Sequence, residues 1–158
     1  MQFGSISTFA MRPAFLRGAW LAAAALLAAG ALQAQTVART PLAPDHPLIG
    51  KWKLEIPNSA CDGFFEVRAN GTTRATSAEQ VIESDVDLTP KPSENGYYKI
   101  AEKVTTENGK ANCVGRKITI GQSGTNFVIL NRDGDEFLLC AKEDINTCVG
   151  PFARQKAN

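Results

Sequence analysis

The sequence predicts an all-β fold, an eight-stranded antiparallel up-and-down barrel stapled by two disulfides. Short stretches of alternating apolar and polar residues follow one another along residues 48–140, separated by turn residues such as Asn-Gly and Asp-Gly. No stretch after residue 34 has the apolar period of a long helix. The same portion holds four cysteines, an even number whose spacing does not match a metal site. Eight strands is about the size at which side chains fill a barrel or leave one small cavity.

Residues 1–34 have the pattern of a secretory signal peptide. Arg12 and Arg17 precede an apolar run over residues 19–31, and Ala34 is a small residue suited to cleavage. The apolar run is too short for a membrane anchor. We therefore expect a periplasmic or secreted protein without a membrane anchor.

The exported portion is one small domain of nearly neutral charge. Removing 34 of the 158 residues leaves 124, with 15 basic and 16 acidic side chains. This balance gives no electrostatic reason to expect nucleic acid or an anionic membrane as a partner. A start at Met11 would give a signal peptide of more ordinary length than Met1, which raises Met11 as an alternative start.

The domain is organised around its first strand. Residues 35–47 contain three prolines and no periodicity, which predicts an extended, partly mobile lead-in to a barrel over residues 48–158. Residues 48–56 then alternate, with Gly50 and Trp52 on the apolar face and charged residues on the other.

Two hairpins follow, and pairing rules predict a register for each. Strands over 64–68 and 72–76 flank a three-residue loop in which Gly71 is left-handed. The expected pairs are Val67 with Thr73, Phe65 with Ala75 and Glu66 with Arg74.

The second hairpin joins strands over 80–88 and 97–106. One register satisfies both of its faces and directs Tyr98 and Glu102 inward. Its expected pairs are Asp87 with Lys99, Glu83 with Lys103, Val86 with Ile100 and Leu88 with Tyr98.

The last three predicted strands span residues 112–120, 125–130 and 136–140. Both faces of the final pair are apolar, and we expect Phe127 to point inward. Residues 149–152 are the nearest segment that could cover the outer apolar face.

Strand order also predicts how the cysteines pair. In an up-and-down barrel Cys61, after the first strand, and Cys113, after the fifth, lie at the same end. Cys140 ends the eighth predicted strand at the other end, and Cys148 follows it closely. We therefore expect the disulfides Cys61–Cys113 and Cys140–Cys148.

One family resemblance follows from the first strand. Gly50-Lys51-Trp52 resembles the glycine-x-tryptophan signature of lipocalins and bacterial lipocalin-like domains, and residues 65–72 look like the second-strand hairpin of the latter. In that family a basic residue near the C-terminus covers the tryptophan, and Arg154 occupies a suitable place. The resemblance implies a barrel that binds a small ligand.

No set of side chains predicts catalysis, so we expect no enzyme, cofactor or metal. The only histidine, His46, lies in the lead-in and is expected to be solvated or loosely packed. The acidic segment 131–136 lacks the glycine and glutamate positions of a calcium loop. Glu102 is the exception, because alternation directs a carboxylate into the barrel. It is either a polar contact for a ligand or a barrel-mouth position turned toward water.

Two functions from different classes remain. The first is a small-ligand binding module with apolar contacts inside the barrel. The alternative is an interaction protein, for instance an inhibitor of a periplasmic or foreign enzyme, that acts through loops on a filled barrel. An interior that can hold a ligand favours the first. The predicted interior ligand residues are Trp52, Phe65, Tyr98, Glu102 and Phe127.

Overall fold

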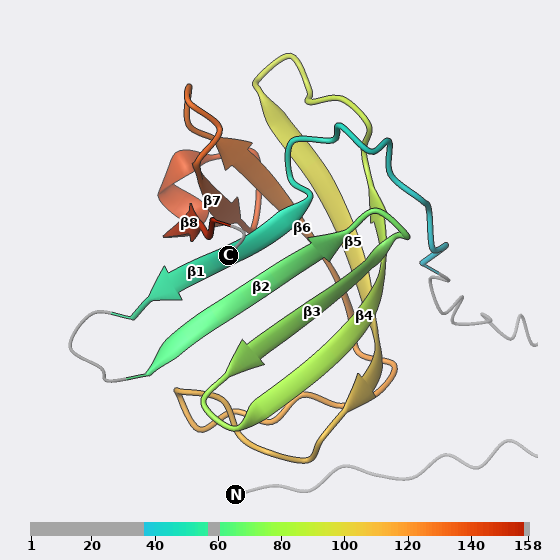
Figure 1. The fold of residues 1–158 in the computed structure, drawn as a ribbon, viewed down its shortest axis with the longest axis vertical. Coiled ribbons are helices and arrows are strands. Elements are labelled where there is room, and N and C mark those ends of the chain that lie inside the picture. Colours follow the sequence, from blue (N-terminus) through green and yellow to red (C-terminus); the bar gives the residue numbers. More distant parts are fainter. Residues whose placement is uncertain (1–36, 57–60, 157–158) are drawn as a thin grey trace, which may run out of the picture. The chain divides into compact units, whose positions relative to one another are not determined.

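The protein forms a closed barrel of eight antiparallel strands in sequence order (Figure 1). The computed structural model describes residues 37–56 and 61–156, so the predicted signal peptide lies outside the described residues. The predicted fold class is confirmed. The strands are β1 (Gly50–Glu55), β2 (Asp62–Arg68), β3 (Thr72–Ser77), β4 (Gln80–Leu88), β5 (Tyr97–Glu107), β6 (Ser123–Leu130), β7 (Glu136–Cys140) and β8 (Cys148–Arg154), with a 3₁₀ helix η1 (Ile145–Thr147) before β8.

The predicted strand over 112–120 is wrong, because these residues turn. The Asn112 side-chain oxygen accepts hydrogen bonds from the backbone N–H groups of Val114 and Arg116, at 3.1 and 2.9 Å. Gly115 adopts a φ of +76°, which glycine allows at little cost. Local side-chain hydrogen bonds therefore replace a strand ladder here.

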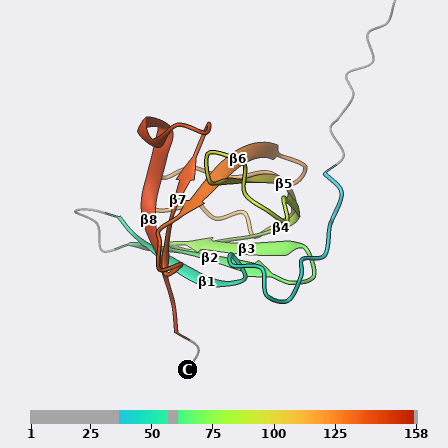
Figure 2. The same ribbon diagram turned by 90° about the horizontal axis from the view of Figure 1, so that it is seen from above.

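The eighth strand is instead β8, which closes the barrel between β7 and β1. We expected its residues only as a cover for the outer face. Gly150 and Pro151 lie within it, and a glycine followed by a proline is typical of a loop. Figure 2 shows β8 running beside β7 toward β1.

The hairpin of β2 and β3 has the predicted register. Val67 pairs with Thr73, and the other expected pairs hold as well. Gly71 has a φ of +76°, and a Cβ there would lie 2.5 Å from the carbonyl oxygen of Thr40. The turn and the chain passing over it therefore both require glycine.

The predicted register of β4 and β5 is wrong by two residues. Val86 pairs with Glu102 rather than Ile100, and Asp87 pairs with Ala101 rather than Lys99. Side chains alternate with a period of two, so this shift leaves every residue on its predicted face. The alternation could therefore not distinguish the two registers.

Glu83 also has partners other than the one predicted. It receives hydrogen bonds from Arg68 at 2.7 Å and Arg74 at 2.9 Å, whereas Lys103 lies opposite Asp85. The pairing register also shifts between Glu83 and Ser84, so the pairs at the open end of the hairpin, away from its loop, differ further from those predicted.

Phe127 lies on the outer face of the barrel, which corrects the prediction that it points inward. It pairs with Lys99 and Cys140, whereas Val128 faces the core and is 1% exposed. Since both faces of this strand pair are apolar, hydrophobicity alone could not fix their phase.

The lead-in is part of the fold rather than a mobile segment. The backbone N–H of Leu42 donates to the carbonyl of Ala69 at 2.8 Å, and that of Thr40 donates to Val86 at 3.1 Å. The side chains of Leu42 and Leu48 are buried in the core. Residues 37–49 therefore cover one end of the barrel, which we call the lead-in end (Figure 1).

Trp52 is the centre of the core at this end. It has no exposed surface, its ring meets Phe137 edge-on at 4.8 Å, and its indole N–H donates to the carbonyl of Leu48 at 3.0 Å. Phe137 in turn stacks on Phe152 at 4.6 Å. Trp52 thus ties the lead-in to β1, β7 and β8.

Arg154 covers Trp52, as the family resemblance implied. Its guanidinium carbon lies 4.0 Å from the centre of the indole ring. The same group donates to the carbonyls of Gly134 at 3.1 Å, Ile49 at 2.9 Å and Pro47. Gly50 has a φ of +136°, and a Cβ there would lie 3.0 Å from Arg154 Nη1. Glycine therefore leaves room for the guanidinium.

Both expected disulfides form. Cys61 bonds to Cys113 across 52 residues, and Cys140 bonds to Cys148 across eight. The strand order predicted the second bond for the wrong reason, because Cys140 ends β7 and faces Cys148 across the β7–β8 pair. Paired cysteines suggest an oxidising, exported environment. Within residues 37–56 and 61–156 no helix is long and apolar enough to cross a membrane.

The first prediction concerns Trp52 and Arg154. Trp52→Ala should lower the free energy of unfolding by about 3–5 kcal/mol, because it leaves a large cavity. Arg154→Ala should cost about 2–4 kcal/mol, more than loss of stacking alone, because three carbonyls lose a charged donor. Chemical denaturation measures both. Arg132→Ala, which removes an exposed arginine, is the control and should change stability by no more than about 0.5 kcal/mol. If Arg154→Ala changed stability as little as this control does, the bridging role of Arg154 would be contradicted.

The second prediction concerns the disulfides. On the chain-entropy model, replacing Cys61 and Cys113 by serine should cost about 4 kcal/mol, and replacing Cys140 and Cys148 about 2.5 kcal/mol, because the first bond closes the longer loop. Thermal unfolding of the two double variants gives the order. Non-reducing peptide mapping of the secreted protein should recover only these two pairs.

Candidate functional site

The barrel interior has two unlike halves. Most inward side chains near the lead-in end are enclosed, apart from Tyr98 and Leu130, whereas several toward the other end, apart from Gln80 and Val104, keep part of their surface exposed to solvent. The enclosed side chains are Trp52, Val67, Thr73, Ser84, Val86, Leu88, Ile100, Val128 and Phe137. The partly exposed ones are Leu54, Phe65, Ala75, Ile82, Glu102, Asn126 and Leu139. The interior toward the β5–β6 strand connection is therefore less completely closed than the interior beneath the lead-in.

Glu102 lies where the two halves meet. On the inner face it neighbours Val86, which is fully buried, and Gly124, which is exposed. The Thr73 hydroxyl donates to Oε1 of Glu102 at 2.8 Å. Oε2 accepts no hydrogen bond within the described residues. The described residues contain no fully enclosed side-chain oxygen without a partner, so Oε2 retains a small solvent-accessible surface although the carboxyl is largely buried.

Gly124 leaves open space beside this carboxylate. It pairs with Glu102, and a Cβ built at Gly124 would meet no atom within 4 Å. Asn126 and Val128 continue the same inward face of β6, so the missing side chain would point into the barrel. The sequence predicted a turn at Gly124. Extending the inward alternation of Val128 and Asn126 back to this position could have shown that Gly124 faces the interior.

Burial raises the pKa of the Glu102 carboxyl above its ordinary value of 4.5, and the hydrogen bond from Thr73 opposes this only in part. The inner faces around Glu102 explain the direction. The neighbouring strands β3, β4 and β6 present Thr73, Ser84, Val86, Gly124 and Asn126. None of these side chains carries a charge that could stabilise the carboxylate.

A disulfide-tied connection borders the accessible half. Residues 108–122 join β5 to β6 and run along the far end of the barrel (Figure 1). The side-chain amide of Gln80 donates to the carbonyls of Lys110 and Arg116, at 3.1 and 3.3 Å. The Cys61–Cys113 bond then fixes the connection to the beginning of β2. We call this end of the barrel the β5–β6 end.

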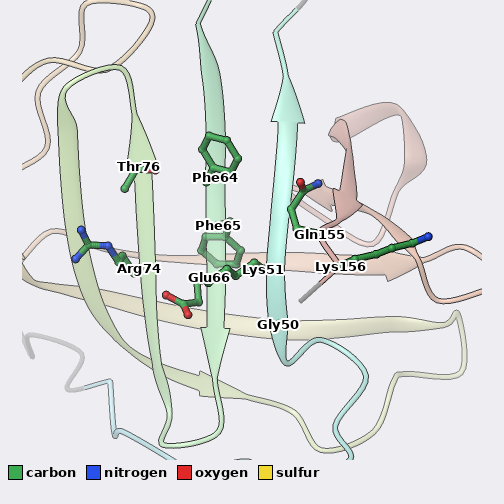
Figure 3. A pocket seen from close by; sticks show the side chains of 9 residues that line it. All are labelled: Gly50, Lys51, Phe64, Phe65, Glu66, Arg74, Thr76, Gln155 and Lys156. Carbon is green, nitrogen blue, oxygen red and sulfur yellow. The ribbon is translucent and has the colours of Figure 1, made fainter. Parts of the chain in front are cut away.

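A second hollow lies outside the barrel. A half-open groove of about 840 Å³ runs over the outer face of β1, β2 and β3 beside residues 155–156 (Figure 3). Two of its charged side chains are already paired, Arg74 with Glu83 and Glu66 with Arg68. Lys51 and Lys156, which also line the groove, form no ion pair among the described residues, and Phe64 is 45% exposed. The groove is therefore a second place where a ligand could bind.

The predicted interior residues do not form one site. Glu102 and Phe65 are partly exposed, although the Phe65 ring also lies 6.4 Å from that of Phe137. Trp52 is fully enclosed, and Tyr98 packs at the lead-in end against His46, with ring centres 5.2 Å apart. Phe127 lies outside. Glu102 and Phe65 are thus the predicted residues that an interior ligand could touch.

His46 is buried, which corrects the expectation that it is solvated or loosely packed. It is 6% exposed, its Nε2 lies 3.1 Å from the carbonyl of Thr89, and its Nδ1 accepts the backbone N–H of Leu48 at 3.3 Å. Both ring nitrogens thus hold the lead-in in place.

The segment 131–136 is a turn held by its own side chains. Asn131 accepts hydrogen bonds from the backbone N–H groups of Asp135 and Glu136. No group of three or more acidic, histidine or cysteine side chains suited to a metal occurs in the described part of the chain.

Comparison with protein-family models, with curated proteins and with solved structures finds no match to this chain. The interpretation of the site therefore depends on its own geometry.

The third prediction concerns Glu102 and pH. Above pH 4.5 the folded state binds more protons at Glu102 than the unfolded state, because its folded pKa is raised. The free energy of unfolding should therefore fall as pH rises from 4.5 through that folded pKa. Glu102→Gln should not show this loss, so its stability relative to the wild-type protein should increase with pH.

Denaturant unfolding at pH 4, 6 and 8 measures this difference. Glu94→Gln, in the exposed loop before β5, is the matched control. Its stability relative to the wild-type protein should not change with pH. A Gln variant that becomes less stable than the wild-type protein as pH rises would mean that Glu102 is an internally compensated ion, and the site would be structural.

Proposed function

We propose that this protein is a small-ligand binding module whose site is the accessible half of the barrel interior. The observation that carries the proposal is the Glu102 carboxyl inside the barrel, which accepts one hydrogen bond, from Thr73, among the described residues and whose strand neighbour on β6 is a glycine. A carboxylate in such a place lowers stability unless something compensates it. An interior that keeps a polar group at this cost, among the apolar side chains of Leu54, Phe65 and Ile82, has the composition of a ligand site.

The proposed module is lipocalin-like and exported. The contact of Arg154 with Trp52 and the space that Gly50 provides support the likeness. The signal-peptide pattern of residues 1–34, together with the disulfides, supports a periplasmic or secreted location. We propose binding without catalysis, because the inner faces of the neighbouring strands present hydroxyl, amide and apolar groups to Glu102 but no histidine, lysine or cysteine side chain.

The fourth prediction tests the site by filling it. Gly124→Leu should place a side chain in the open space beside Glu102 with little strain, because a Cβ there meets no atom. An apolar fluorescent probe such as N-phenyl-1-naphthylamine should bind the wild-type protein and lose affinity by about tenfold or more in this variant. Fluorescence titration measures the change.

Thr125→Leu is the matched control, because it adds the same side chain to the outer face of the same strand. It should leave probe binding unchanged. If Gly124→Leu binds as the wild-type protein does while Phe64→Ser loses the probe, the ligand occupies the outer groove instead.

The interaction-protein alternative has one specific observation in its favour. Val114 and Ile120, on the disulfide-tied β5–β6 connection, are 72% and 64% exposed. Exposed apolar side chains on a rigidly held loop suit contact with a protein partner. Under this alternative, Val114→Asp and Ile120→Asp would abolish capture of a periplasmic protein, while Gly124→Leu would have no effect.

A further inference from the structure

We infer that the ligand is an amphiphile with a protonated amine, whose ammonium group bonds to Glu102 while its apolar body lies along Phe65, Ala75 and Ile82. This inference rests on the proposed function and adds the chemical class of the ligand. Its basis is a largely buried carboxyl, one of whose oxygens accepts no hydrogen bond from the described residues, one row above a partly exposed apolar wall.

The wall and the carboxylate lie on connected inner faces. Phe65 pairs with Ala75 and Ala75 with Ile82, so the three side chains form one row across β2, β3 and β4. The next row toward the lead-in end contains Thr73 and Ser84, and Thr73 holds Glu102 by its hydroxyl. A ligand with its charged end at Glu102 can therefore direct its apolar part over this row toward the β5–β6 end.

The missing partner of Glu102 is a cation. The inner faces of β3, β4 and β6 bring hydroxyl, amide and apolar groups to the carboxylate but no positive charge. An ammonium group would supply a charge and up to three hydrogen-bond donors. The raised pKa of Glu102 agrees with a carboxyl that lacks such a partner.

Other head groups fit less well. A carboxylate ligand would place two acids together, which disfavours the ionisation of one of them. An alcohol would donate one hydrogen bond and leave the charge of Glu102 uncompensated. The structure thus ranks an amine above an alcohol, and an alcohol above a carboxylate.

The test compares three ligands with one chain, decylammonium, decanol and decanoate, by calorimetric titration of the mature protein at pH 8 and below the micelle concentration. Decylammonium should bind about tenfold or more tightly than decanol, because a charge-assisted pair replaces a neutral hydrogen bond. Decanoate should bind most weakly. In Glu102→Gln the preference for the amine should disappear while decanol binding persists.

Asp87→Asn is the matched control, because it removes a carboxylate from the exposed outer face of the adjacent strand. It should keep the full preference for the amine. An equal loss of preference in Asp87→Asn would assign the effect to the general charge of the surface and overturn the inference.

The outcomes separate this inference from the proposed function. Decanol that binds the wild-type protein but not Gly124→Leu, without a preference for the amine, keeps the interior site and overturns the amine. Tighter binding of decanoate overturns it in the same way. Failure of all three ligands to bind overturns both.

Discussion

The structure depends on the guanidinium of Arg154 above the ring of Trp52. This one group donates to carbonyls of the lead-in, of the residue before β1 and of the β6–β7 turn, and so joins three segments. It also lies against the pair formed by β1 and β8, where the barrel closes. A planar fork with several donors can satisfy carbonyls in several directions at once, which a lysine could not do. The same side chain thus contributes both to closing the barrel and to covering its lead-in end.

That arrangement concentrates stability at the lead-in end. Trp52, Phe137 and Phe152 pack together there, and the lead-in hydrogen bonds to the turn at Gly71 seal them. The β5–β6 end has no comparable aromatic cluster among the described residues, and a disulfide fixes its connection instead. A covalent bond restricts the unfolded chain without filling the interior. The protein can therefore be stable while half of its interior stays accessible.

The sequence predicted which residues face inward better than which residues face each other. Alternation placed Trp52 and Glu102 correctly, and the turn at Gly71 determined the register of its hairpin because a short loop leaves little choice. The β4–β5 pair has a long loop, and a slip of two residues keeps every charge on its face, so nothing local opposed the error. A strand was predicted over residues 112–120, which form a turn, and none was predicted at β8. Hydrophobicity shows neither the hydrogen bonds of the Asn112 side chain nor that a segment containing Gly150 can pair as a strand.

The candidate site was half predictable for the same reason. An inward carboxylate is readable from alternation, so Glu102 stood out, but the space beside it is produced by a glycine that resembles a turn residue. A larger residue at this position of β6 would have filled the interior and buried Glu102 without access to solvent. An apolar residue in place of Glu102 would have extended the core into this half. The combination of a carboxylate on β5 and a missing side chain opposite it on β6 lowers stability twice, through desolvation and through lost packing. These two departures from a well-packed core are neighbours on the inner face of the barrel, which is our reason for proposing a binding site there.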